Sequence, residues 1–582
     1  MMARQAGRRP QPQSDELAWM LLGGGLGFVL LLVVAWWAGG LASEPVREAA
    51  GSANPATIIL GQFGGSVPVT ATQIGVFAGI VVVLAGIGAL LGWAAWKQAG
   101  GRSRVDDRAK SMAHVKDLDE LSAKSQAADA QRLGATAASD GVPLAKLVNN
   151  RKRLFASWEW VQLWIMGPRA GKTSCVCVPQ ILETRGPVVA TSNKRDIVDL
   201  TRGPRSREGV VWVHDVQGII GEPAAWYWNP LSFVDGMENA EKLTDVFVSA
   251  MTNANAREDA YFGPTAKGVL ARYFLAAALG ERPITDVYRW VNDETDFTAV
   301  RLLRDAGEFG HAENLEGNQK VTSKQRDGIF GQVRTWVGIL GNPKVASWVR
   351  PDANPNRPQF DPEAFVKSTD TIYLISREGG GSARAITAAL VMAILHTAER
   401  VASRQAGGRL STPLMAVLDE AANVVRWPEL PDLYSHYGSR GIVVSTFFQS
   451  FEQGVEAFGE HGMKKMWSAA NIRVAGSGLS EDRFLPFLSS LIGDRDVVKR
   501  TSQTQGGRVG GRSASTSVQR ERIMEPSDLA QLPRGRAVMT ASGQPAALLE
   551  LEHFSQKDYA GDVKASQEFY EAQIGKEDQH VG

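Results

Sequence analysis

A Gly-Lys-Thr tripeptide at residues 171–173, within the stretch WIMGPRAGKTS, is the first feature of the sequence that could do chemistry. Such a tripeptide ends the phosphate-binding loop G-x-x-x-x-G-K-[ST], in which backbone N–H groups and the lysine hold nucleotide phosphates. Here only three residues separate Gly167 from Gly171, so the first glycine of the pattern falls on Met166. Either the loop is one residue shorter, or Met166 makes its opening turn. The sequence predicts these nucleotide-binding residues: Gly167, Pro168, Arg169, Ala170, Gly171, Lys172, Thr173 and Ser174.

A pair of acidic residues would complete such a site. Lys172 would reach the β- and γ-phosphates of ATP, and Thr173 would ligate Mg²⁺. The partner of the loop is a buried strand that ends in an acid, and PLMAVLDEAAN (413–423) has this pattern. Asp419 would then join the Mg²⁺ shell, and Glu420 would act as general base toward the attacking water. The alternative is that these acids only cap a helix that follows the strand.

A third polar position ends another apolar run, GIVVSTFFQS (441–450), at Gln449. A polar side chain at a strand tip beside the acid-bearing strand can sense the γ-phosphate. Taken alone, Gln449 is equally well a capping residue. We therefore predict ATP and Mg²⁺ as ligands, with Glu420 and Gln449 as catalytic residues.

Several short runs rich in Val, Ile and Leu would position these residues. Continuous apolar runs bounded by turns indicate strands buried on both faces, and their alternation with helical patterns indicates a parallel sheet of βαβ units. The α/β fold class follows from this alternation. The runs are 160–166, 186–192, 209–215, 370–376, 414–420, 441–448 and 471–477.

Two other segments lack the alternation of apolar runs and helical patterns. Between about residues 233 and 365 the strand pattern disappears, and 266–280 and 328–341 have helical periodicity, which predicts an all-helical insertion. The stretch 499–522 is rich in Gly and Ser. It is either a mobile surface loop or a basic arm that touches a nucleic-acid backbone. Its basic residues are Lys499, Arg500, Arg508, Arg512, Arg520 and Arg522.

Two uncharged segments near the N-terminus, Leu17–Ala42 and Ile74–Trp96, are long enough to cross a bilayer. A signal peptide is excluded for the first, because Asp15-Glu16 precedes it and a second span follows. Tryptophans near the span ends are typical of a membrane interface. They are Trp19, Trp36, Trp37, Trp93 and Trp96.

Charges around the spans predict their orientation. Basic residues precede the first span and follow the second, whereas the loop between them holds only Glu44, Arg47 and Glu48. The sequence therefore predicts a multi-pass protein of the cell membrane, in contact with membrane lipid. The positive-inside rule places both of its termini on the cytoplasmic side. The net charge of +1 indicates no acidic partner by itself, and the two cysteines, Cys175 and Cys177, exclude a disulfide framework.

At this point the chain resembles the type IV secretion coupling proteins, the membrane-anchored ATPases of bacterial conjugation, of the TraG/TraD type. The resemblance covers most of residues 1–550, and we expect an actinobacterial source. The matching features are the two spans, GPRAGKT, GPVVATSNKRDIVD, WYWNPL (226–231), the helical insertion, VLDEAAN, the strand that ends at Gln449, and the stretch 466–497.

This resemblance implies a RecA-like P-loop NTPase fold and a homohexameric ring with ATP between subunits. It also implies two kinds of partner: single-stranded DNA with a bound relaxase, or a protein substrate, and the components of a type IV secretion channel. The position where many relatives carry a trans-acting arginine is Gly438 here, so Arg440 is the candidate for that catalytic role. Asn193 replaces an acid common in the family, so only Lys194 of that motif carries over.

The predicted domains follow. They are a cytoplasmic tail (1–16), a transmembrane hairpin (17–96, spans 17–42 and 74–96), a juxtamembrane helix and linker (97–150), the RecA-like ATPase domain (151–232 and 366–551), the inserted all-α domain (233–365) and a flexible C-terminal tail (552–582).

Two other functions compete with an ATP-driven coupling protein. A septal-type double-stranded DNA translocase usually has four spans, a long linker and a C-terminal winged helix, which this sequence lacks. A membrane receptor of a secretion channel that binds nucleotide with little hydrolysis would agree with the short loop and the displaced arginine. An ABC transporter ATPase is disfavoured, because the sequence contains no Leu-Ser-Gly-Gly-Gln signature.

Overall fold

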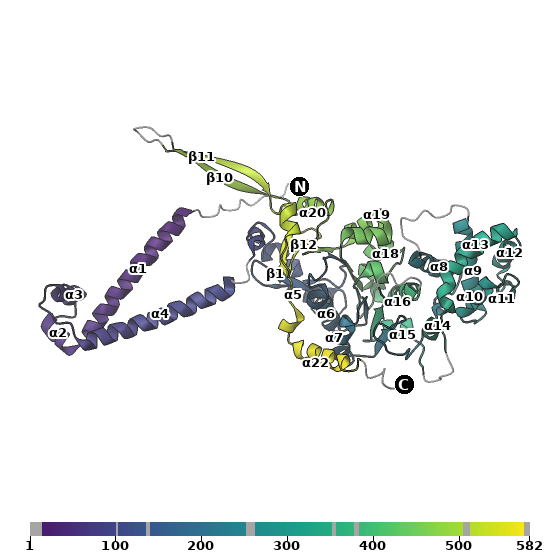
Figure 1. Cartoon of the computed structure of the whole chain (residues 1–582), viewed down its shortest axis with the longest axis horizontal. Helices are drawn as coiled ribbons and strands as arrows, with labels where there is room; N and C mark the ends of the chain where they lie inside the picture. The colour runs from purple at the N-terminus through teal and green to yellow at the C-terminus, as the bar shows by residue number, and fades with distance from the viewer. Residues whose placement is uncertain are drawn as a thin grey trace. The chain divides into compact units, whose positions relative to one another are not determined.

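A computed structural model describes residues 14–99, 103–135, 140–251, 262–351, 357–377, 383–504 and 512–574 (Figure 1). The chain forms two units, one of residues 1–104 and 496–520 and one of residues 105–495 and 521–582. Most of the predicted N-terminal tail, residues 1–13, and Arg508 of the predicted basic arm lie outside the described residues.

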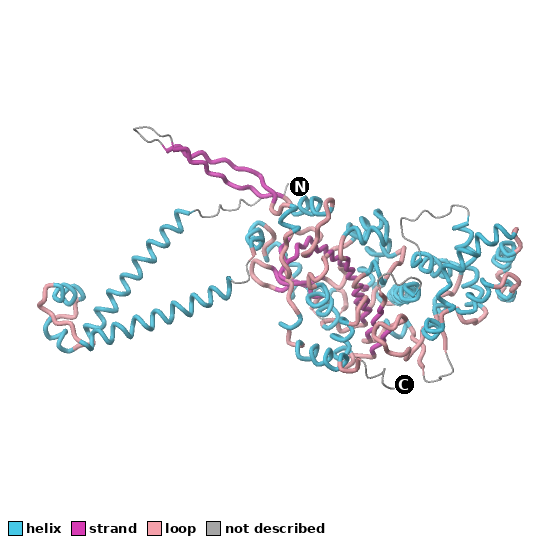
Figure 2. The backbone as a smooth tube through the Cα atoms, in the orientation of Figure 1, coloured by secondary structure: helices cyan, strands magenta, loops and turns pink. Residues whose placement is uncertain are grey.

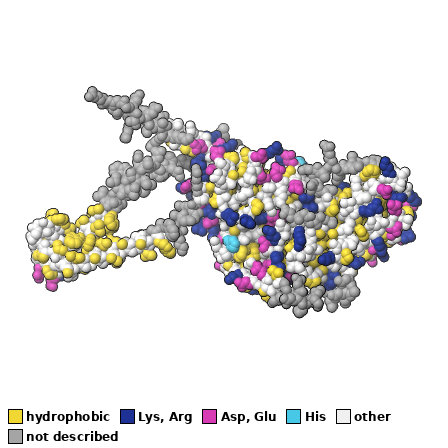
Figure 3. All heavy atoms as spheres, in the orientation of Figure 1, with side chains coloured by type: hydrophobic (Ala, Val, Ile, Leu, Met, Phe, Trp, Pro, Cys, Tyr) yellow, Lys and Arg dark blue, Asp and Glu magenta, His cyan; other side chains and the backbone are white. Residues whose placement is uncertain are grey.

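The first unit contains two long apolar helices, α1 (Ser14–Leu41) and α4 (Ala71–Ala99), which pack against each other. Hydrophobic side chains cover their described surface (Figure 3). The part of α4 from Ala71 to Leu90 is a candidate span, and so is Gly27–Leu41 of α1 together with α2 (Glu44–Ala50), which bends away from it by 97°. Both predicted spans therefore coincide with helices that are apolar enough to cross a membrane.

Of the two alternatives for the stretch 499–522, a mobile surface loop or a basic arm, the surface loop is wrong for the described part of the stretch. That part belongs to a two-stranded ribbon of β10 (Asp494–Thr504) and β11 (Arg512–Arg522). The two strands contain the β-branched residues Val497, Val498, Thr501, Thr504, Thr516 and Val518, and β-branched residues favour strands even in a polar sequence. Gly and Ser content alone does not reveal this.

A mixed sheet of 11 strands forms the second unit, in the order β2-β1-β13-β12-β9-β3-β8-β7-β4-β6-β5 (Figure 2). All seven predicted runs are strands, and neighbours among them pair in parallel. They are β3 (Gln162–Ile165), β4 (Val188–Ser192), β5 (Val211–His214), β6 (Thr371–Ile375), β7 (Leu414–Leu418), β8 (Ile442–Phe448) and β9 (Ile472–Gly476).

Four further strands make the sheet mixed rather than purely parallel. They are β1 (Val142–Leu147), β2 (Arg153–Ala156), β12 (Arg536–Ala541) and β13 (Ala547–Glu550), and all their pairings are antiparallel. Each contains a charged residue, namely Lys146, Arg153, Arg536 or Glu550, so none has the uninterrupted apolar run that reveals a strand buried between helices.

Alternate residues of the parallel strands face two separate cores. Along β7, Leu414, Ala416 and Leu418 belong to one core, and Met415 and Val417 belong to the other. Helices α6 (Val178–Leu182) and α7 (Asp196–Arg205) follow β3 and β4, and α16 (Ala383–Ser403) is buried in the first core. Although α16 is apolar and long enough to span a membrane, its burial makes it a core helix.

The helical insertion shares the first core with the sheet. Its two predicted helical segments lie in α9 (Phe262–Leu279) and in α13 (Ser323–Val337) with η5 (Gly338–Gly341). Figure 1 shows the insertion helices grouped beside the sheet. The others are α8 (Met237–Met251), α10 (Thr285–Asn292), α11 (Thr298–Asp305), α12 (Phe309–Gln319), α14 (Pro343–Val349) and α15 (Pro362–Val366).

The segment predicted as juxtamembrane helix and linker (97–150) packs against the sheet in its described part. It contains η1 (Arg104–Ser111), η2 (Val115–Leu121) and α5 (Ala123–Arg132) before β1. Arg536 in β12 donates from Nε to Asp106 Oδ1 at 2.8 Å, and the Ala113 N–H donates to the Ala546 carbonyl at 2.8 Å. Leu118 and Leu121 are buried, so this Ala-rich sequence holds enough apolar surface to pack.

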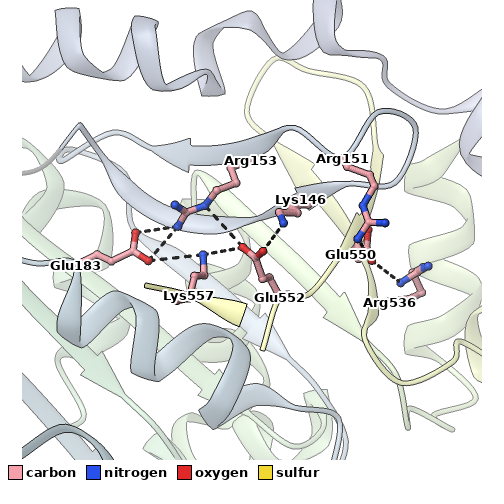
Figure 4. Close-up of polar contacts among 8 residues, drawn as sticks. All are labelled: Lys146, Arg151, Arg153, Glu183, Arg536, Glu550, Glu552 and Lys557. Atoms are coloured by element: carbon pink, nitrogen blue, oxygen red, sulfur yellow. Dashed lines mark hydrogen bonds and ion pairs between the residues drawn. The ribbon is translucent and has the colours of Figure 1, made fainter. Parts of the chain in front are cut away.

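The C-terminal segment also differs from the predicted flexible tail. Glu552 accepts a hydrogen bond from Lys146 and lies 2.7 Å from Lys557 Nζ, in a network that includes Arg153 and Glu183 (Figure 4). Helix α22 (Ala560–Glu571) then packs on α7, where the buried Ser566 hydroxyl donates to the Asp199 carbonyl at 2.6 Å. This segment is polar, and ion pairs, which periodicity does not reveal, hold much of it.

Candidate nucleotide-binding site

Three adjacent strands bring the predicted site residues together. Strands β3, β8 and β7 are neighbours, and their parallel register aligns their carboxyl ends. The phosphate-binding loop follows β3, Gln449 follows β8, and Asp419-Glu420 follows β7. Ligands of open α/β sheets bind at the carboxyl ends of the strands, so this edge is where a nucleotide site is expected.

The first part of the loop is packed tightly against the turn after β9. The Met166 N–H donates to the Phe448 carbonyl and the Gly167 N–H donates to the Ser477 carbonyl, both at 2.9 Å. A Cβ atom at position 167 would lie 2.4 Å from the Gly478 carbonyl oxygen. Gly167 is therefore required by this close backbone approach, one position later than the first glycine of the usual pattern.

The rest of the loop contains two residues with left-handed backbone. Gly171 has φ +90°, and Arg169, which carries a side chain, has φ +59°. Such a conformation is uncommon outside glycine and costs free energy. Pro168 and Arg169 are exposed, whereas Ala170 is buried. The loop thus presents its tip to solvent on a strained backbone.

The helix after the loop begins with an unusual turn. The Val178 N–H donates to the Thr173 carbonyl, five residues back, so Thr173–Cys177 form a π-helical turn (η3). Such turns hold one residue more than an α-helical turn and occur often at functional sites. The loop has one residue fewer than the usual pattern and this turn has one residue more than an α-helical turn, so together they hold the usual number of residues.

Lys172 lies between the two predicted acids. Its Nζ is 3.1 Å from Asp419 Oδ1 and donates a hydrogen bond to Glu420 Oε1. Burial lowers the pKa of Lys172, but the two carboxylate charges outweigh this and leave the pKa raised. Burial raises the pKa of Asp419, opposed by the positive charge of Lys172. The lysine is therefore firmly charged.

Asp419 also contacts the residue predicted to share a metal with it. The Thr173 hydroxyl donates to Asp419 Oδ2 at 3.3 Å, and the Thr191 hydroxyl, from β4, donates to the Asp419 carbonyl at 2.8 Å. A hydroxyl and a carboxylate are hard oxygen ligands of the kind that Mg²⁺ prefers, and Mg²⁺ usually completes its shell with water and phosphate. The residues present fit that ion.

Glu420 is held in place by Gln449. Gln449 Nε2 lies 3.0 Å from both carboxylate oxygens of Glu420, and Asn423 Nδ2 lies 3.5 Å from one of them. The Gln449 N–H in turn donates to Gln453 Oε1 at 2.8 Å. Glu420 has φ +55°, a strained conformation that turns the chain sharply after β7 and points its side chain toward Lys172.

Arg440 is not brought to this group of residues. It belongs to η7 (Gly438–Arg440), before the start of β8, whereas Gln449 follows the other end of the same strand. Its Nη1 donates to the Gly408 carbonyl at 3.0 Å. A Cβ atom at Gly438 would lie 1.9 Å from the Glu159 carbonyl oxygen, which explains why no arginine occupies position 438.

Several contributors were missed from the sequence. Asn423 is three residues after Glu420, on the first turn of α17 (Ala421–Val424), and that spacing was a usable signal. Thr191 lies in a strand that the pattern located and Gly478 lies in the turn after another, but their contacts depend on the strand order, which sequence does not reveal. Lys194 is exposed after β4, and no contact joins it to the site.

Comparison with known proteins agrees with this architecture. Residues 413–534 match the family described as the TraM recognition site of TraD and TraG. No curated protein sequence matches this chain.

Solved structures of a bacterial conjugative coupling protein, TrwBdeltaN70, share the fold. The trigonal form with sulphate is 15% identical to this chain in sequence, with a TM-score of 0.52. The match covers 72% of this chain and 92% of that one. The unbound monoclinic form is 14% identical with a TM-score of 0.51, and covers 72% and 91%. TrwB with the ATP analogue ADPNP is 14% identical with a TM-score of 0.50, and covers 73% and 92%.

The chain thus has the fold of the conjugative coupling protein TrwB and, over residues 413–534, matches the family of TraD and TraG, which confirms the resemblance to the type IV secretion coupling proteins that its sequence predicted.

Proposed function

We propose that this protein is a membrane-anchored ATPase that couples a DNA–relaxase or protein substrate to a type IV secretion channel in conjugative transfer. The convergence of Lys172, Thr173, Asp419, Glu420 and Gln449 from three neighbouring strands carries the proposal. The match to a TraD and TraG region and the fold of a conjugative coupling protein support the biological setting.

The contacts suggest how the residues act. Lys172 would bind the β- and γ-phosphates, and Thr173 and Asp419 would hold Mg²⁺, whose charge would offset that of the phosphates. Lys172 donates a hydrogen bond to the Glu420 carboxylate. The phosphate oxygens of a bound nucleotide would therefore compete with that carboxylate for Lys172. Once released, Glu420 accepts a proton from the attacking water, and Gln449 orients that water and the carboxylate.

The remaining parts of the proposal concern assembly and location. In a homohexameric ring, Arg440 would act on the neighbouring subunit's nucleotide, since it lies away from the site of its own chain. Single-stranded DNA with bound relaxase, channel components and membrane lipid are the proposed partners. The distribution of Lys and Arg around the spans supports an orientation with both termini on the cytoplasmic side of the cell membrane.

One observation favours a second candidate, a nucleotide-binding receptor of the channel with little hydrolysis. Lys172 is bonded to the proposed base itself, and the loop is short. If nucleotide binding does not separate Lys172 from Glu420, the base stays neutralised and turnover is slow.

The test is the rate of ATP hydrolysis by the full chain in lipid nanodiscs, with and without single-stranded DNA. We expect DNA-stimulated hydrolysis that is lost in Lys172→Ala and retained in Lys324→Ala, an exposed lysine of α13. Hydrolysis at the wild-type rate in both Lys172→Ala and Glu420→Gln would contradict the proposal. Nucleotide binding without turnover, with DNA present and the ring assembled, would favour the receptor.

A further inference from the structure

The loop between the two spans is a folded cap rather than an extended connector. Its core is Val46, Ile58 and Val67, with relative exposures of 5% or less. Helix α3 (Pro55–Phe63) begins at Asn54, whose side chain accepts the Ala56 N–H at 3.0 Å. Gly61 is required here, because a Cβ atom would lie 2.6 Å from Val67 Cγ2. The orientation of α3 within the cap is therefore fixed.

The outer face of α3 is strongly apolar. Leu60 is 68% exposed and Phe63 is 89% exposed, although Ile58 on the same helix is fully buried. Ala56, Leu60 and Phe63 have the i, i+4, i+7 spacing of one helical stripe. An exposed apolar stripe on a folded element indicates an interaction surface.

Charge separates α3 from the other helix of the cap. The acidic and basic residues of the loop, Glu44, Arg47 and Glu48, all lie in α2, and none occurs from Ala49 to Trp96. The cap is thus amphipathic, with a charged helix on one side and an uncharged helix on the other. Water suits the first helix and hydrocarbon suits the second.

Hydrogen bonds fix α3 at the ends of the two spans. Gln62, next to Phe63, accepts from Trp36 Nε1 of α1 at 2.8 Å and donates to Gln73 Oε1 of α4 at 2.6 Å. Gln73 is fully buried and donates to the Trp36 carbonyl at 3.3 Å. A tryptophan at a span end is typical of the boundary between lipid and water. The stripe on α3 therefore belongs to a helix held at the ends of two spans whose own exposed apolar residues include Val82 and Val83.

We propose that α3 is an interfacial helix that inserts Leu60 and Phe63 into the outer lipid leaflet, fixing the depth of the transmembrane hairpin. This inference rests on the proposed membrane anchoring. Two spans joined by a flexible loop could slide along the bilayer normal. A rigid cap with an apolar stripe on one side and charges on the other resists that movement in both directions.

The test places a nitroxide label at single cysteines in the full chain, in nanodiscs of phosphatidylcholine and phosphatidylglycerol. Phe63→Cys is the test position, Glu48→Cys is the matched position on the charged helix, and Val82→Cys reports the middle of α4. Burial raises the pKa of the native Cys175 to about 11, and Cys177 is buried, so neither competes for the label near pH 7. The chain without an introduced cysteine is the blank.

Collisions with oxygen and with a water-soluble nickel complex then measure depth. We expect positions 63 and 82 to favour oxygen and position 48 to favour nickel. If the label at position 63 collides mainly with nickel while the label at position 82 collides mainly with oxygen, the inference is overturned and membrane anchoring is left intact. Low access of both reagents at position 63 would also overturn it, because a protein partner or a second copy would cover the stripe. A nickel-favouring position 82 would overturn the anchoring and the inference together.

Discussion

Arg205 lies at the amino ends of strands β4 and β6, and Lys172 lies at the carboxyl end of β3, so each end of the same sheet holds a buried cation. Arg205 Nε donates to the Thr371 hydroxyl at 2.6 Å, and its guanidinium also donates to the carbonyls of Thr184, Gly186 and Thr369. Lys172 instead faces two carboxylates.

The difference separates a structural end from a functional end. Neutral acceptors take four hydrogen bonds from the Arg205 guanidinium, and this is typical of a buried group that only stabilises the fold. At the other end, two acids share one lysine, and Glu420 and Arg169 both have positive φ. Strain and excess buried charge are retained where they serve binding or catalysis.

The largest effect is expected at the functional end, from Glu420→Gln. The amide keeps the shape of the side chain but cannot accept a proton, so kcat for ATP hydrolysis should fall by about 10²- to 10⁴-fold. Nucleotide affinity, measured by fluorescence of a labelled ATP analogue, should change little. The exposed Glu456→Gln is the control. A kcat within about twofold of wild type would remove Glu420 from the role of base.

The structural end is tested by Arg205→Met, which keeps the apolar stem and removes every donor. Three acceptors on buried residues and the carbonyl of the exposed Thr369 lose their partner, so we expect a destabilisation of about 3 kcal/mol or more, measured as the midpoint of chemical unfolding. Arg207→Met, at an exposed ion pair with Asp562, should change stability by about 0.5 kcal/mol or less. Nucleotide affinity should be preserved in the folded fraction. Equal effects of the two variants would contradict the comparison.

Gly167→Ala tests the packing that replaces the missing residue of the loop. The new Cβ atom would lie 2.4 Å from the Gly478 carbonyl oxygen, so the loop must shift and its N–H groups leave their positions. Nucleotide affinity should fall by about 10-fold or more, because small misplacements are costly at preorganised sites. Gly331→Ala, with open space around its Cβ in α13, is the control and should bind nucleotide normally.

The smallest effect is expected from Asp419→Asn on stability in the absence of nucleotide. The pKa of Asp419 is raised in the folded chain, so its ionised form opposes folding at neutral pH. The variant should therefore melt slightly higher than wild type at pH 7. The gain should vanish as pH falls through the raised pKa, because the wild-type carboxyl then becomes neutral. With Lys172→Met in both chains the gain should grow, since the lysine no longer offsets the charge.

Sequence alone located most of the elements that build the functional end. Each of its strands is buried on both faces and therefore has a run of Val, Ile and Leu, and each acid or amide follows such a run directly. The antiparallel strands β1, β2, β12 and β13 escaped, because a charged residue in each of them interrupts or ends that run. The contact of Glu552 with Lys146 and the packing of α22 on α7 escaped because they join residues more than 300 positions apart.

Within the site, the predicted residue types were easier to identify than their geometry. The strand order places Thr191 against Asp419 and Gly478 against Gly167, and no local pattern encodes that order. The role of Gly167 itself changes: the glycine that looked one position late is the one that the neighbouring backbone requires.

The π-helical turn at Thr173–Cys177 has a consequence for comparing this chain with its relatives. An alignment that opens a single gap in the loop, and none afterwards, pairs residues of the turn that occupy different places in space. A gap in the loop followed by an unmatched residue in the turn restores the correspondence from Val178 onward. Relatives with the same displaced residue would be overlooked by searches that count positions between glycines, and would be found by searches that anchor on the strand before the loop and the second turn of the helix after it.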